Sequence, residues 1–188
     1  VAIGDIEELA IATASVNGLL IVDEAYAEFS SEKSAITLID KYPNVLVSRT
    51  MSKAFAFAGV RLGYLAANKV VIDALQLVRL PYHLSAITQA AAEVALDFQD
   101  ELLAEVSKLA ADRDEVAIAL KALGLKVIPS DANFILFGGF AQSSHELWEK
   151  LLAEGVLIRD VGLAGYLRVT IGNDAENQAF LKALKGAL

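Results

Sequence analysis

Residues 19–26 read LLIVDEAY, a short apolar run that becomes polar at Asp23. Such a run is too short for a helix and is typical of a strand that is buried on both faces in a parallel sheet. A second run of this kind, VLV at residues 45–47, follows a turn at Pro43 and becomes polar at Ser48. The two runs predict an α/β fold with a mostly parallel sheet.

The rest of the chain alternates between helical and strand patterns. We expect helices at residues 6–15, 85–97, 101–123 and 143–154, after Asn68 and after Asn173, a weakly helical segment at 35–42, and strands at 63–67, 126–128, 133–137, 156–158 and 166–171. Three pairs have the spacing of a capping box, namely Asp5 with Glu8, Ser143 with Glu146, and Asn173 with Glu176. Gly124 is placed to end the long helix.

The long helix at 101–123 separates two regions of different character. Strands and helices of an α/β pattern precede it, and short strands alternate with helices after it. We place a domain boundary near residue 120, so that residues 1–120 form one domain and residues 121–188 form a second, smaller one.

Composition limits the classes of function. Hydrophobic residues make up 55% of the 188 and charged residues 21%, which excludes a disordered chain. The formal charge of −8 argues against a nucleic-acid or anionic membrane surface, because both need clustered Lys and Arg. Cysteine is absent and His83 lies far from His145, so we expect neither thiol chemistry nor a histidine metal site. We also expect no targeting or membrane-spanning segment.

Ionisable and hydroxyl side chains follow both apolar runs. They are Asp23, Tyr26, Thr50, Ser52, Lys53 and, somewhat further along, Arg61. The carboxyl ends of parallel strands line a common crevice. A lysine near apolar residues and cations becomes a nucleophilic amine, an arginine with hydroxyls suits a phosphate, and a carboxylate can keep a pyridinium nitrogen protonated. Together these requirements describe pyridoxal phosphate.

Longer motifs around these residues resemble a known family. The strings VDEAYAEF (22–29), RTMSKAF (49–55) and AGVRLGY (58–64) look very like class I and II aminotransferases of fold type I, in particular those that act on histidinol phosphate. The resemblance continues through LPYHLSA, SDANFILF, GVLIRDVG and LRVTIG, so it covers essentially the whole chain. It implies that residues 1–120 are the C-terminal part of a large cofactor-binding domain and that 121–188 are the small C-terminal domain.

The resemblance also implies a role for each matching residue at the cofactor. Asp23 would pair with the ring nitrogen of pyridoxal phosphate, and Tyr26 would hydrogen-bond the phenolic oxygen of the ring. Lys53 would form the Schiff base and carry the proton between substrate and cofactor. The phosphate would be held by Thr50, Ser52 and Arg61.

The substrate site implied by the resemblance lies in the last third of the chain. Arg168 and Arg159 would bind the anionic end of the substrate, and Asn133 would support this region. The implied reaction is transamination of L-histidinol phosphate with 2-oxoglutarate in histidine biosynthesis. An arginine fork can serve both the phosphate of one substrate and the carboxylate of the other.

The family further implies a cytoplasmic homodimer whose partners are small-molecule amino donors and acceptors. In this family a long segment precedes the VDEAY strand and supplies half of the cofactor pocket, so the chain resembles the C-terminal half of the enzyme. We therefore expect it to transaminate poorly by itself. The alternatives are an aminotransferase for aromatic amino acids, a related phosphothreonine decarboxylase, and a catalytically silent fragment.

Overall fold

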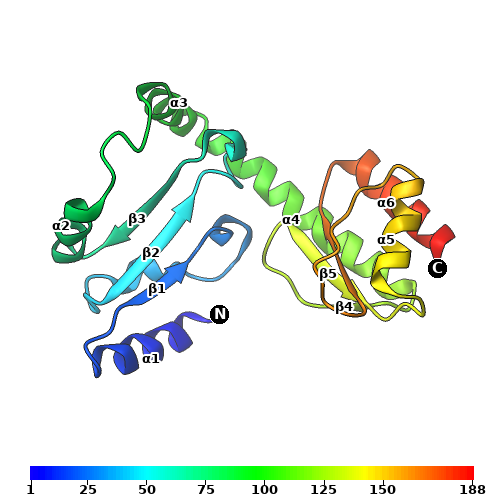
Figure 1. Ribbon diagram of the computed structural model, residues 1–188, viewed down its shortest axis with the longest axis horizontal. Helices are drawn as coiled ribbons and strands as arrows, with labels where there is room; N and C mark the ends of the chain where they lie inside the picture. Colours follow the sequence, from blue (N-terminus) through cyan, green and yellow to red (C-terminus); the bar gives the residue numbers. More distant parts are fainter. The chain divides into compact units, whose positions relative to one another are not determined.

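The computed structural model describes residues 1–188, which divide into two compact units, Val1–Leu103 and Ala104–Leu188. The division falls within α4 (Gln99–Ala122), the long helix drawn in green in Figure 1. The sequence pattern places the boundary further along the chain, near residue 120. The correspondence between these units and the two domains of a larger enzyme stays a prediction.

The first unit contains a three-stranded sheet in the order β1-β2-β3 (Figure 1). β1 (Leu20–Asp23) pairs in parallel with β2 (Val45–Thr50), as the two apolar runs predict. β3 (Gly63–Ala67) pairs with β2 in the antiparallel direction. Asp23 and Ser48 are partners in the register of β1 and β2, so both strands become polar at the same edge of the sheet.

One face of this sheet carries the main core of the unit. α1 (Ile3–Ala14) and the 3-10 helix η2 (Ala35–Leu38) pack against Val45 and Val47 there. Leu20 and Val22 of β1 contact the same cluster, whereas Ile21 is 65% exposed. The expectation that β1 is buried on both faces is wrong for this chain, because successive strand side chains alternate and α1 and η2 cover one face.

Two further helices follow the sheet, as the sequence predicts. They are α2 (Lys69–Val78) and α3 (Ala86–Asp97). α3 contributes Ala92 and Ala95 to a small buried cluster around Met51, which anchors the loop after β2. No helix of the chain combines the length and the apolar character needed to cross a membrane.

The second unit combines an antiparallel sheet with helices (Figure 1). Its elements are β4 (Lys126–Val127), β5 (Phe134–Gly138), α5 (Ser144–Ala153), β6 (Tyr166–Thr170) and α6 (Asp174–Ala187), with strand order β4-β5-β6. Its fully buried core side chains include Leu120, Ile135, Phe137, Leu147, Leu151, Leu167 and Leu184. Because these come from α4, α5, α6 and two strands, one core joins all the longer elements of the unit.

The expected strand at 156–158 does not form. An isolated antiparallel bridge joins Arg159 to Arg168 instead. The indole N–H of Trp148 donates to the carbonyl of Ile158 at 2.8 Å, and this bond takes an acceptor that a continuing strand would use for pairing.

The expected capping box at the start of the first helix is also wrong. α1 begins at Ile3, so Asp5 lies inside its first turn and cannot precede the helix as a cap. The residue at the cap position is Ala2, which makes no side-chain cap. Asp5 still places a negative charge near the positive end of the helix dipole.

The capping boxes predicted at α5 and α6 are both confirmed. At α5, Ser143 Oγ accepts a hydrogen bond from the Glu146 N–H at 3.2 Å, and the Glu146 carboxylate accepts one from the Ser143 N–H at 3.0 Å. The bond from the Ser143 backbone is the main reason that the pKa of Glu146 lies below its ordinary value of 4.5.

Replacing Glu146 with glutamine is expected to remove a pH-dependent part of the stability. The pKa of Glu146 is depressed in the folded state, so the stabilisation is fully present above its unfolded pKa and is lost as pH falls through the folded pKa. Urea unfolding of the wild type and of Glu146→Gln at a series of pH values checks this prediction. The wild type should be the more stable above the ordinary pKa of 4.5, and its advantage over Glu146→Gln should shrink as pH falls below that value. A difference independent of pH would contradict this cause.

Candidate active site

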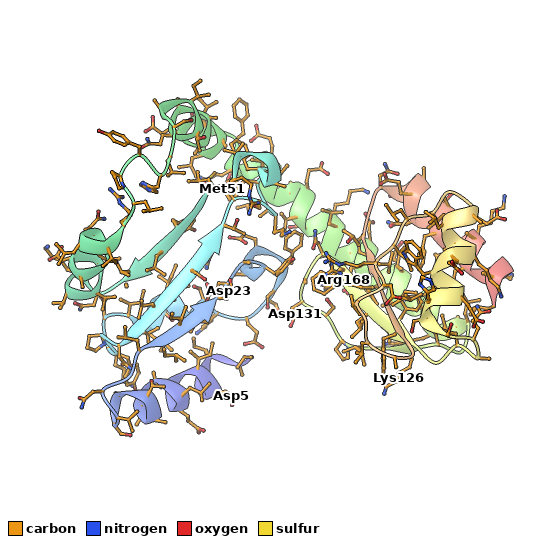
Figure 2. All side chains as sticks on the ribbon, viewed as in Figure 1. Asp5, Asp23, Met51, Lys126, Asp131 and Arg168 are labelled. Carbon is orange, nitrogen blue, oxygen red and sulfur yellow. The ribbon has the colours of Figure 1, made fainter.

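Asp23 lies at the carboxyl end of β1 (Figure 2). Ser48 of β2 is its partner in the register of the two strands. Its Oδ1 accepts hydrogen bonds from the Ser48 hydroxyl at 3.2 Å and from the Ala25 N–H at 3.1 Å. Both side chains lie on the sheet face opposite α1, because they alternate with Val22 and Val47, which contact the core beneath that helix. The Asp23 carboxylate is therefore fixed in direction and still exposed to a ligand.

The structure brings Tyr26 and Lys53 together from separate segments. Tyr26 immediately precedes the 3-10 helix η1 (Ala27–Phe29) after β1, and Lys53 lies in the loop after β2. The Lys53 Nζ atom is 5.5 Å from the centroid of the Tyr26 ring, which is within the cation–π range of about 6 Å. An exposed amine and a phenol thus meet where the two parallel strands end.

The remaining predicted residues of this unit, Thr50, Ser52 and Arg61, lie at the two ends of the loop that joins β2 to β3. Thr50 Oγ1 donates a hydrogen bond to the Leu62 carbonyl at 3.2 Å and accepts one from the Ser52 N–H at 3.1 Å. Arg61 has a φ of 57° and donates from Nη1 to the Ala58 carbonyl at 3.1 Å. A non-glycine residue in this left-handed region costs about 1–3 kcal/mol, and such strain concentrates at ligand-binding sites.

Arg49 is a half-buried residue that the sequence patterns did not single out. It lies on β2 between Ser48 and Thr50, and its Nη2 contacts a carboxylate oxygen of Glu24 at 2.7 Å. A signal for this pair was present in the sequence. Glu24 and Arg49 directly follow Asp23 and Ser48, so opposite charges come side by side once the strands are aligned.

The second unit places Arg159 and Arg168 directly opposite each other in an isolated antiparallel bridge. The N–H of each donates to the carbonyl of the other at 2.9 Å. In a hydrogen-bonded antiparallel pair of this kind, both side chains leave on the same face. Asn133 borders the same sheet, and its carbonyl accepts a hydrogen bond from the Ile171 N–H at 2.9 Å.

Arg168, which is labelled in Figure 2, carries a polar atom without a hydrogen-bond partner. Its guanidinium lies over the ring of Phe134, 4.7 Å from the centroid, and its buried Nε makes no hydrogen bond. A buried donor left unsatisfied costs about 1–3 kcal/mol, which an anion that accepts from it would recover. This side chain is therefore suited to an anionic ligand.

The donor set of the first unit fits pyridoxal phosphate in its chemistry. It offers an amine for the aldehyde carbon, a carboxylate for the ring nitrogen, a phenol for the ring hydroxyl, and two hydroxyls with a guanidinium for the phosphate. Arg61, which supplies the guanidinium, also has left-handed backbone of the kind that ligand sites often contain. No group of three or more metal-ligating side chains occurs in the structure.

The family model of aminotransferase class I and II matches residues 2–184. The chain belongs to this family, which confirms the resemblance seen in its motifs. The histidinol-phosphate aminotransferase of Nocardia farcinica is 64% identical over 166 residues, which are 88% of this chain and 43% of that protein. The chain therefore spans less than half the length of this curated relative.

Solved structures agree with this assignment and confirm the fold type I architecture. The L-threonine-O-3-phosphate decarboxylase of Porphyromonas gingivalis matches with a TM-score of 0.87 and 27% identity, covering 99% of this chain and 59% of that one. The histidinol-phosphate aminotransferase of Sinorhizobium meliloti, solved in complex with pyridoxal-5'-phosphate, matches with a TM-score of 0.79 and 30% identity, covering 90% and 48%.

Proposed function

We propose that this protein catalyses the pyridoxal-phosphate-dependent transamination of histidinol phosphate with 2-oxoglutarate. Residues 1–188 would supply the cofactor lysine and the anion-binding arginines. The observation that carries the proposal is the meeting of Lys53 with Tyr26 at the strand end that bears Asp23. An amine can bind the aldehyde carbon of the cofactor, a carboxylate can pair with its ring nitrogen, and a phenol can donate to its ring oxygen.

Each residue then has one task. When bound, pyridoxal phosphate supplies an electron sink for negative charge at the substrate's α-carbon. Lys53 holds the cofactor through Nζ and, once its amine is free, moves the proton at that carbon. Asp23 accepts a hydrogen bond from the protonated ring nitrogen and keeps it charged. Tyr26 donates from its hydroxyl to the ring oxygen, and the phosphate is held by Thr50, Ser52 and Arg61.

Arg159 and Arg168 would recognise the substrate. Two guanidinium groups that leave one sheet face can both contact the phosphate of histidinol phosphate or the side-chain carboxylate of glutamate. The unsatisfied Nε of Arg168 supports this role, and Asn133 would help to hold the strand edge beside it. We further propose that the enzyme works in the cytoplasm as a homodimer.

Substrate choice tests this proposal. The chain is mixed with pyridoxal phosphate and with the remaining residues of the Nocardia farcinica relative, supplied in trans, and glutamate formation from histidinol phosphate and 2-oxoglutarate is measured. Arg168→Leu is expected to raise KM for histidinol phosphate by about ten- to a hundredfold, because hydrogen bonds to charged groups contribute about 1.5–3 kcal/mol. Lys185→Met, which removes an exposed cation of the same unit, should leave KM unchanged.

The alternatives predict different products in the same assay. Faster turnover of aromatic amino acids than of histidinol phosphate would show that an aromatic amino acid is the substrate. Loss of carbon dioxide from phosphothreonine would favour the decarboxylase, a solved structure of which matches this chain with a TM-score of 0.87. Turnover only when the complementing residues are present would show that residues 1–188 need a partner segment for activity.

A further inference from the structure

A charged cluster lies on the sheet face opposite Asp23. Asp23 and Ser48 are register partners, and the Glu24 N–H donates to the Ser48 carbonyl at 2.9 Å, so the pairing continues one residue past the strand. Side chains alternate along a strand. Glu24 and Arg49 therefore point to the face opposite Asp23 and Ser48, on the side where α1 packs.

The Arg49 guanidinium binds two carboxylates at once. Its Nε and Nη2 donate to one Glu24 oxygen at 3.0 and 2.7 Å, and its Nη1 donates to Glu28 at 3.0 Å. These side chains are 16% exposed for Arg49, 10% for Glu24 and 11% for Glu28. Ser34 and the Ala35 N–H complete the cluster by donating to Glu24 at 2.7 and 2.6 Å.

The guanidinium stays charged in this setting. Burial lowers the pKa of Arg49, but the hydrogen bond to Glu24 and the charges of Glu24 and Glu28 outweigh burial, so the pKa lies above its ordinary value. An arginine fork fixes the direction of each bond, whereas a lysine is a point charge on a flexible stem. Buried pairs of this kind serve geometry in some proteins more than they add stability.

The cluster connects the segments that carry the proposed cofactor residues. Glu24 directly follows Asp23 in the chain, Glu28 lies two residues after Tyr26, and Arg49 directly precedes Thr50. One side chain thus ties the turn after β1 to the end of β2, which leads to Lys53. We propose that Arg49 is a positioning residue, which holds Asp23 and Tyr26 in register with Lys53 from the far side of the sheet. This inference rests on the proposed function.

The test compares wild type, Arg49→Met, Arg49→Lys and Glu24→Gln in the full 188-residue chain. Hydrogen exchange without cofactor should become faster at residues 23–29 in Arg49→Met, while β2 keeps its protection. The dissociation constant for pyridoxal phosphate, read from the Lys53-dependent absorbance, should rise by at least about tenfold. Misplacing reacting groups by about 1 Å can lower a reaction rate about a hundredfold. Arg49→Lys should recover part of both effects. Glu24→Gln, of the same size, should show the same local loosening.

A matched control is Lys41→Met, which removes the exposed Lys41–Glu7 pair of the same unit and should change neither readout. The inference is overturned if Arg49→Met exchanges like the wild type at 23–29, or if exchange rises equally through the whole unit. It is also overturned if the segment loosens and cofactor affinity does not change. A wild type that shows no Lys53-dependent band even with the complementing residues supplied in trans would instead overturn the proposed function, and the exchange result would still decide whether Arg49 orders the segment.

Discussion

Lys53→Ala is expected to abolish the visible absorption band that pyridoxal phosphate develops with this chain, together with all resistance of that band to dialysis. The side-chain amine is the group that holds the cofactor carbon, and alanine leaves nothing in its place. Turnover in the complemented enzyme should fall by at least about 10²- to 10⁴-fold, which is what a positioned proton-transfer group typically contributes. Absorbance scans before and after dialysis, followed by a glutamate assay, measure both effects.

The neighbourhood of Lys53 determines the controls. Lys33→Ala removes an exposed lysine of the same unit and should leave the band intact. Lys53→Arg keeps the positive charge near the Tyr26 ring but offers no amine that releases its proton, so it should lose the band as alanine does. A stable band in Lys53→Ala would show that another amine carries the cofactor and would refute the assignment.

Phe137→Ala is expected to destabilise the second unit by about 3–5 kcal/mol, as large-to-small changes of buried aromatic residues do. Phe137 is fully buried, and its ring meets those of Phe140 and Phe180 with centroids 6.2 and 5.8 Å away. A loss of this size is a large part of the roughly 5–15 kcal/mol by which native proteins are stable. Arg168 would then lose its fixed position, because it lies on β6, which pairs along the strand β5 that carries Phe137.

The chain provides its own probe for this experiment. Trp148 is its single tryptophan and lies on α5, so its fluorescence during urea unfolding reports on the second unit. Leu152→Ala, on the same helix but 43% exposed, should change stability by no more than about 0.5 kcal/mol. Equal losses for the two variants would show that the unit is not held by the core around Phe137.

The site could be predicted from the sequence where chemistry follows directly from a strand end. Asp23 and Lys53 each follow an apolar run, and parallel pairing of two such runs brings their ends to one edge of the sheet. The resemblance implies that Arg159 and Arg168 bind one anion, and the structure brings them together although the expected strand at 156–158 does not form. One backbone pair was enough to align them.

The remaining features depend on contacts between residues distant in sequence. The exposure of Ile21 could not be predicted, because it depends on which face α1 and η2 cover. The Arg49 cluster needs Ser34 and Ala35, which are brought to Glu24 by the path of a loop rather than by any local pattern. Left-handed backbone at Arg61 gives no sequence signal, because the residue is not glycine.

The bridge between Arg159 and Arg168 has a consequence for how fast an anion arrives. Residues 1–188 carry a formal charge of −8, which repels anionic ligands at long range. Two cations fixed on one face attract them at short range. At physiological ionic strength the Debye length is about 8 Å, so salt screens the distant carboxylates far more than the groups in contact with the ligand. The cell's own electrolyte would thereby weaken the repulsion and leave the local attraction in place.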